Sequence, residues 1–303
     1  MLMPAVDTYV AVRRAAGYKL RDVERYLREF AQFATTRGDS HVVAQTAITW
    51  AAQSPSEEQR AERLSIVIRF ARFAHAEDPR HEIPPERQFC SRHRRPVPYI
   101  FTAEEIQTLV AQAAYLGPLG SLRSHLYRTL FGLLAVTGLR ISEALALRFK
   151  DITPDGLVIR ETKFHKSRLL PLHETTTAAL ERYMAQRRQL DLDDDHLFVS
   201  TRRRPLCAKA ARETFYQLLA TAGIAQEADR PRPRLMDLRH TFATTVLAAC
   251  PDDREHIRRH MLALSTYLGH TGIASTFWYL ERTPALMGDI AQTCEAFFGR
   301  AGA

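Results

Sequence analysis

A tyrosine near the end of the sequence has the partners that phosphodiester chemistry needs. Tyr279 stands nine positions after His270 (279 − 270), Arg239 precedes both, and a second arginine, Arg140, lies far upstream. Guanidinium groups grip the non-bridging oxygens of a phosphate through paired hydrogen bonds, and a phenol is a competent nucleophile. These residue types predict metal-free cleavage of a phosphodiester, with DNA as the substrate.

The residues around Arg140 and Arg239 predict where these two side chains lie. Gly138 permits a sharp turn that leaves Arg140 at the head of a helix, although a surface arginine after a turn would have the same pattern. The apolar stripe that includes Leu238 and Phe242 places Arg239 at its edge. An unpaired buried charge is costly, so Arg239 is expected to have a partner or to reach a cleft.

The composition agrees with a phosphate ligand and gives no sign of a cofactor or metal. The chain has 303 residues, enough for two domains, and 42 Lys and Arg against 34 Asp and Glu give a net charge of +8. Such a balance is typical of nucleic-acid binding, but it also serves solubility. The four cysteines lie far apart, without a CxxC pair. We expect a cytoplasmic, nucleoid-associated protein with reduced thiols and no membrane partner.

The first part of the sequence predicts a small helical domain over residues 1–78. Leu27 and Phe30 belong to an apolar face, and Ser54 to Glu57 has the pattern of a capping box that opens another helix. That helix carries four arginines that are candidates for phosphate contacts or for a solvated face: Arg60, Arg63, Arg69 and Arg72.

A basic, proline-containing linker over residues 79–100 and a second domain over 101–303 complete the organisation. The linker offers three arginines to a nucleic-acid backbone: Arg92, Arg94 and Arg95. A capping box at Thr102 to Glu105 begins the second domain, residues 126–136 form a buried helix, and residues 157–160 and 168–172 form two strands. The predicted fold class is mainly α with a small antiparallel β-sheet, in two domains.

Three segments together resemble the tyrosine recombinase family, the phage-integrase type of site-specific DNA recombinase. TGLRISEAL (137–145) is similar to the first arginine box of the family and LRHTFAT (238–244) to the second. LGHTGIASTFWY (268–279) is similar to the segment that joins the histidine to the nucleophile. The resemblance implies a helical DNA-binding domain followed by a mixed α/β catalytic domain.

The resemblance also implies a role for each matching residue. Tyr279 would be the nucleophile of a 3′-phosphotyrosyl intermediate, and Arg140 and Arg239 would hold the phosphate and stabilise its developing charge. His270 would donate a further hydrogen bond. Lys163 would protonate the leaving oxygen, and Lys166, also a candidate for DNA binding, is its nearest alternative.

Met236 departs from the family pattern, which has histidine three residues before the second arginine. A thioether offers no proton, so a slowed enzyme is expected. His240 and His165 are candidate substitutes. The alternative is a catalytically impaired DNA-binding or accessory protein with the same fold, and a third hypothesis is an enzyme that relaxes supercoiled DNA.

The partners follow from the resemblance. We expect a double-stranded recombination site, assembly as a dimer to tetramer on DNA, and accessory proteins that bend DNA or set direction. The apolar side of residues 290–298 would dock on a neighbouring subunit or pack on its own domain. Integration or transposition of a mobile genetic element is the expected context.

Overall fold

The computed structural model describes residues 2–18, 20–89, 97–118, 121–160, 167–190, 192–224, 231–249 and 254–269. They belong to two compact units, Met1–Pro96 and Val97–Ala303. The division between the units falls inside the predicted linker, and the predicted domain bounds stay a prediction. No helix among the described residues is both long and apolar enough to cross a lipid bilayer.

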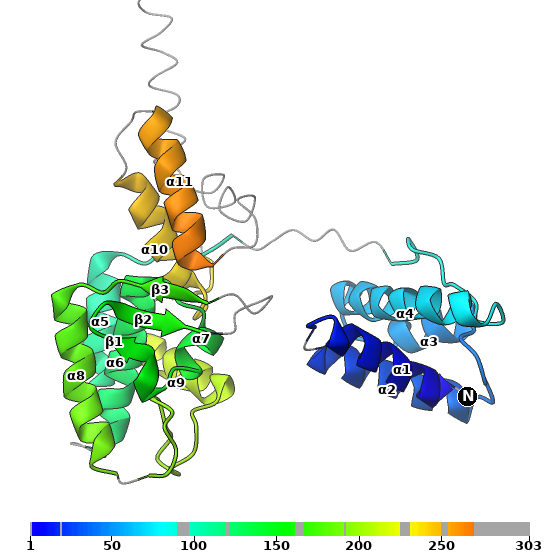
Figure 1. Cartoon of the computed structure of the whole chain (residues 1–303), viewed down its shortest axis with the longest axis horizontal. Helices are drawn as coiled ribbons and strands as arrows, with labels where there is room; N and C mark the ends of the chain where they lie inside the picture. Colours follow the sequence, from blue (N-terminus) through cyan, green and yellow to red (C-terminus); the bar gives the residue numbers. More distant parts are fainter. Residues whose placement is uncertain are drawn as a thin grey trace, which may run out of the picture. The chain divides into compact units, whose positions relative to one another are not determined.

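All regular secondary structure among the described residues of the first unit is helical (Figure 1). Its elements are α1 (Leu2–Ala15), α2 (Arg21–Thr36), α3 (Ala44–Ala52) and α4 (Glu57–Glu77). Leu27 and Phe30 are fully buried, as the apolar pattern predicts, and the Phe30 ring meets the edge of Trp50 at 5.5 Å between centroids. Helix α4 packs against the other three helices, so it forms the centre of this unit.

The beginning of the predicted linker packs on the first unit. The backbone N–H of Glu82 donates to the carbonyl of Val42 at 2.8 Å, and the Glu82 carboxylate accepts from the N–H of Ala44 at 2.7 Å. Phe89 also contacts the apolar core of this unit. The segment that leads away from α4 is therefore held to the loop before α3.

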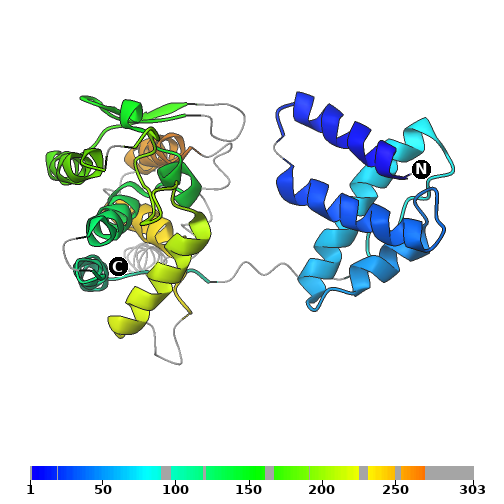
Figure 2. The ribbon, with the colours of Figure 1, turned by 90° about the horizontal axis from the view of Figure 1, so that it is seen from below.

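The second unit is built around α6. Its elements before the sheet are α5 (Ala103–Ala113), α6 (Leu122–Thr137), α7 (Ile141–Leu145) and a 3₁₀ turn (Phe149–Asp151). After the sheet come α8 (Glu174–Arg188), α9 (Ala208–Thr221), α10 (Asp237–Ala248) and α11 (Arg254–Leu268). Helix α6 contacts α5, α8 and α10, which explains its fully buried Leu130 and Phe131. Figure 2 shows α5, α6 and α8 as neighbouring helices of this unit.

A three-stranded antiparallel sheet interrupts these helices. Its strands are β1 (Ile152–Thr153), β2 (Gly156–Ile159) and β3 (Arg168–Leu170), in the order β1-β2-β3. The register pairs Leu157 with Leu170 and Ile159 with Arg168. Leu157, Ile159 and Leu170 are buried, so one face of the sheet covers the core. Strand β3 also contacts α11, and this contact brings the sheet to the arginines described below.

The fold class, mainly α with a small antiparallel sheet, is confirmed, and two local predictions need correction. The helix expected to begin after Ser54 begins at Glu57, because the hydroxyl of Ser56 accepts from the N–H of Gln59 and caps it. The sequence predicted two strands, and β1 adds a third. Two residues are too few for an alternating pattern, so only pairing with β2 identifies β1 as a strand.

Candidate active site

Arg239 is a buried cation that joins the ends of two helices. It lies on α10, is 3% exposed, and its Nη1 donates to the carbonyl of Gly138 at 2.7 Å. Its Nη2 donates to the carbonyl of Leu268 at 2.8 Å. The last carbonyls of a helix have no partner within it and carry partial negative charge. These carbonyls, at the ends of α6 and α11, therefore stabilise a guanidinium that would be costly to bury alone.

Arg140 reaches the same carbonyl from a more exposed position. It is the N-cap residue of α7, and its Nη1 lies 3.5 Å from the Leu268 oxygen and 2.9 Å from Oε1 of Glu143. Its side chain is 35% exposed, so an incoming ligand can contact it. The two arginines lie 99 positions apart in sequence (239 − 140), yet both donate to Leu268. The structure thus brings them together, beside the segment that leads to His270.

Gly138 makes this convergence sterically feasible. It is the C-cap residue of α6 with a φ of 60°, a left-handed conformation that favours glycine. A Cβ at this position would lie 2.5 Å from Cδ1 of Phe242, closer than carbon atoms approach. The absence of a side chain lets α6 and α10 approach closely enough for Arg239 to reach the Gly138 carbonyl.

Glu143 and Arg168 are site residues that the sequence analysis did not identify. Glu143 accepts from the backbone N–H of Arg140 at 3.0 Å, and Arg168 at the start of β3 donates to both Glu143 oxygens at 3.3 and 2.9 Å. The position of Glu143, three residues after the N-cap, is the capping-box position and could have identified it. Arg168 had no comparable signal, because its contact with α7 is a tertiary one.

The charge state of Glu143 follows from these contacts. Burial raises the pKa of this carboxyl, but the hydrogen bond and positive charge of Arg168 oppose that effect. Together with the backbone bond and charge of Arg140, they hold the pKa of Glu143 below its ordinary value. Glu143 is therefore an anion at neutral pH, held between two guanidinium groups.

Met236 stands at the N-cap position of α10, and the residue is 44% exposed. It lines a hollow of about 410 Å³ together with residues of α6, α7, α9 and the segment before α10. Most of this lining is apolar, with two arginines and a tyrosine: Leu134, Leu139, Ile141, Ala208, Arg212, Tyr216, Arg234 and Leu235. The position that carries histidine in the family pattern thus has an apolar side chain facing an accessible hollow, three residues before Arg239.

His240 has the features of a core histidine. Its side chain is 13% exposed, and burial is the main reason that the pKa of His240 is lowered to about 4. The charges of Arg234 and Arg239 act in the same direction, and Asp237 opposes them. The imidazole is therefore neutral at pH 7 and adds no positive charge beside Arg239.

The remaining predicted residues of the site lie outside the described part of the chain. This holds for the nucleophile Tyr279, for His270, for the hairpin residues Lys163, His165 and Lys166, and for the linker arginines Arg92, Arg94 and Arg95. The predicted docking segment of residues 290–298 is also outside it. Their roles stay predictions.

The four candidate arginines of α4 do not share one face. At 100° per residue, Arg60 and Arg63 lie on the side opposite to Arg69. Arg60 donates to the carbonyl of Ser54 at 2.7 Å, and Arg63 lies 4.9 Å above the Trp50 ring and 3.7 Å from Glu29. Arg72 pairs with Glu86. Arg69 is exposed and is the best placed of the four for a phosphate.

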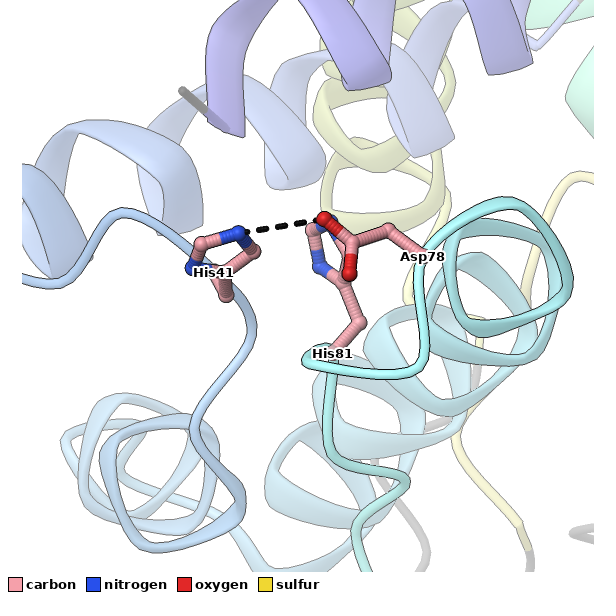
Figure 3. Close-up of side chains that lie close together, drawn as sticks. All are labelled: His41, Asp78 and His81. Atoms are coloured by element: carbon pink, nitrogen blue, oxygen red, sulfur yellow. Dashed lines mark ion pairs between the residues drawn. The ribbon is translucent and has the colours of Figure 1, made fainter.

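A histidine and carboxylate cluster lies in the first unit, at His41, Asp78 and His81 (Figure 3). Nε2 of His41 lies 3.3 Å from Asp78, whose two oxygens also accept from Arg80. The N–H of Val42 donates to Nδ1 of His81 at 3.0 Å, so the neutral ring carries its proton on Nε2. That tautomer opposes metal binding through Nε2. The cluster instead joins the loop before α3 to the end of α4.

Comparison with known sequences assigns most of the second unit to a protein family. The sequence model of the phage integrase family matches residues 100–285. The chain is 39% identical over 302 residues to y4rB of Sinorhizobium fredii, whose name describes it as an integrase/recombinase, with 96% of each chain covered. It is 32% identical over 247 residues to the tyrosine recombinase XerD of Caulobacter vibrioides, covering 80% of this chain and 76% of XerD.

Solved structures of similar fold cover nearly the whole chain. The Tn1549 transposon integrase, in complex with transposon right end DNA, superposes with a TM-score of 0.63 at 19% identity, covering 95% of this chain and 99% of that one. Lambda integrase, as a tetramer bound to a Holliday junction, gives a TM-score of 0.59 at 19% identity, with 89% and 77% covered. At these identities the likeness concerns the fold.

Proposed function

Because the chain belongs to the phage integrase family of tyrosine recombinases, we propose that it cuts and rejoins DNA at a specific site through a 3′-phosphotyrosyl intermediate. The convergence of Arg140 and Arg239 on the carbonyl of Leu268 carries this proposal. It creates a fixed positive site at the end of α11, two residues before His270 in the sequence.

In the proposed reaction, the phenol of Tyr279 releases its proton to solvent as its oxygen attacks the scissile phosphorus. The bond between phosphorus and the 5′ oxygen breaks, and that oxygen leaves as a hydroxyl after it receives a proton from Lys163. Arg140 and Arg239 bind the non-bridging oxygens, where negative charge increases in the transition state. His270 donates a further hydrogen bond. Attack by another 5′ hydroxyl reverses the chemistry and joins a new partner strand, so no external energy source is needed.

The proposed substrate is a double-stranded recombination site, bound by a dimer to tetramer of this chain. Arg69, Arg72, Lys166 and the linker arginines would contact phosphates, with α4 and the linker as the contributing segments. Accessory proteins that bend DNA or set direction would act with it, in the cytoplasm at the nucleoid. The relatives named as integrases and the DNA-bound neighbours support this assembly.

Trapping the covalent intermediate tests the proposal. A nicked duplex that carries inverted repeats from the flanks of the coding region loses its short 5′-hydroxyl fragment after cleavage, so the adduct accumulates. The intact protein should form a covalent complex, and Tyr279→Phe should form none. Absence of the adduct from the intact protein on its true site would contradict the enzyme proposal. Relaxation of supercoiled plasmid without exchanged products would indicate the topoisomerase-like reaction instead.

Met236 favours one alternative, a DNA-binding accessory protein with little catalytic activity. Its thioether supplies no proton at a position where the family pattern has histidine. Restoring that group in Met236→His should raise the adduct rate by about 10²- to 10⁴-fold if acid–base help is what the chain lacks. An inactive intact protein together with an active Met236→His variant would support the accessory role.

A further inference from the structure

Arg168 lies at the junction of three elements around the proposed phosphate site. It begins β3, and its side chain is 11% exposed. Its Nη1 and Nη2 hold the two oxygens of Glu143 on α7, and its Nε donates to the carbonyl of Tyr267 on α11 at 2.8 Å. A planar fork with several donors can make all these bonds at once, whereas an ammonium cannot.

The same guanidinium supports the turn that follows α11. Gly269 has a φ of 66°, and a Cβ there would lie 2.5 Å from Nη1 and 2.8 Å from Cζ of Arg168. The Arg168 guanidinium therefore packs directly against Gly269. Tyr267 and Gly269 flank Leu268, whose carbonyl both Arg140 and Arg239 approach. Arg168 thus fixes the residues on both sides of the shared carbonyl.

Arg168 also determines how much positive charge the site retains. Among the described residues that converge here, Arg140, Arg168 and Arg239 contribute three positive charges and Glu143 one negative charge, which leaves 3 − 1 = +2. Without Arg168 the sum for these residues is 2 − 1 = +1, and of the two described arginines that contact the carboxylate only Arg140 is left. The buried carboxyl, having lost its main partner, then protonates more readily, and a neutral Glu143 no longer orients the Arg140 guanidinium.

On the basis of the proposed function, we infer that Arg168 is a positioning residue for phosphoryl transfer: it holds Glu143 and the end of α11 so that Arg140 and Arg239 keep their geometry and charge. Because it is nearly buried and already engaged by Glu143 and Tyr267, Arg168 acts through these residues. No contact between Arg168 and the substrate is required.

The test is the single-turnover rate of adduct formation on saturating nicked DNA, measured from pH 5.5 to 8. Arg168→Gln should lower this rate by about 10- to 100-fold at neutral pH, with the Kd for DNA changed by less than about threefold. Loss of Arg168 leaves burial as the main influence on Glu143, so the pKa of that carboxyl rises and the rate should fall further as pH decreases. In the part of the chain that the structure describes, Arg140 and Arg168 are the charged groups that act on the pKa of Glu143.

Two further variants separate positioning from structural support. Arg168→Lys keeps the charge beside Glu143 but cannot make all of the bonds of the fork, so its rate should recover only in part and should show no added acid limb. Arg168→Gln with Glu143→Gln removes the carboxyl that titrates, so it should be slow at every pH. The double variant also removes the buried carboxylate that Arg168→Gln leaves without its main partner, so it can be measured even if the single variant folds poorly.

The outcomes distinguish this inference from the proposed function. An active intact protein with an equally active Arg168→Gln variant would overturn the inference alone. So would a rate loss that is independent of pH and accompanied by equal losses of DNA affinity and thermal stability, since that indicates a structural role. An intact protein that forms no adduct on its site would overturn the proposed function, and the inference with it.

Discussion

The arginines of the two units are held in different ways. In the second unit, Arg140, Arg168 and Arg239 meet the last carbonyls of α11, and Arg168 and Arg239 are nearly buried. In the first unit, the arginines of α4 point to different sides of one helix, and Arg69 is exposed. A fixed charge in a site of low dielectric stabilises a developing negative charge more strongly than a hydrated one does. The second cluster suits catalysis, and the α4 arginines suit only binding.

The largest effect should come from Arg239. Arg239→Lys keeps the charge but loses the fork that bridges Gly138 and Leu268, so the adduct rate should fall by about 10²- to 10³-fold at saturating DNA. Arg69→Lys is the matched control in the first unit and should react at the rate of the intact protein. Equal rate losses in the two variants would remove the distinction between the clusters.

The second prediction concerns the turn that presents a carbonyl to Arg239. Gly138→Ala should destabilise the protein by about 2 kcal/mol or more, because its positive φ and the contact with Phe242 both oppose a Cβ. Gly132→Ala, inside the same helix α6 with no atom within 4 Å of the added Cβ, should be neutral or stabilising by up to about 1 kcal/mol. Thermal unfolding measures both. A Gly138→Ala variant as stable as Gly132→Ala would show that the turn does not require glycine.

The third prediction concerns the pH dependence of the free energy of unfolding, which tests whether His240, next to Arg239, is buried in its neutral form. In the unfolded chain His240 protonates as pH falls below about 6.5, whereas in the folded chain its pKa is about 4. This histidine therefore costs stability progressively as pH falls from about 6.5 to about 4, by at most about 3 kcal/mol. As the pH falls through this range, the free energy of unfolding of His240→Asn should decrease less steeply than that of the intact protein. A His240→Asn variant with an unchanged slope would show that His240 is not buried in its neutral form.

The smallest effect is expected in the first unit. Arg69→Ala should weaken DNA binding a few-fold. The slope of the logarithm of the binding constant against the logarithm of salt concentration should also become smaller by about one, because one phosphate contact is lost. Arg60→Ala should leave the salt slope unchanged, because Arg60 is held by the carbonyl of Ser54. Binding titrations at several salt concentrations measure both slopes. A larger slope change for Arg60 than for Arg69 would contradict the assignment of α4 faces.

Local patterns predicted much of the fold because they depend on neighbours in sequence. The capping box of Thr102 and Glu105 is present in the structure as predicted, and Gly138 ends α6. α11 ends before Gly269. Each of these features requires only a few adjacent residues with defined propensities. Strand β1 was missed because its pairing, and not its two residues, defines it.

The candidate site could be predicted only in part. The residue types of Arg140 and Arg239 and their flanking patterns identified them as candidates, and the expectation that Arg239 has partners is confirmed by two carbonyl bonds. The partnership of Glu143 with Arg168 could not be predicted, because 25 positions separate them and no local pattern links β3 to α7. Likewise, the sequence could not show that Arg60 is held by the backbone at Ser54.

A structure of Tyr279→Phe bound to a nicked recombination site would show whether Arg140 and Arg239 hold the scissile phosphate together. We expect the guanidinium groups of Arg140 and Arg239 both to lie within about 3 Å of non-bridging oxygens of the same phosphate, with residue 279 of this or a neighbouring subunit facing that phosphorus. A bound DNA whose scissile phosphate lies away from these two side chains would contradict this expectation.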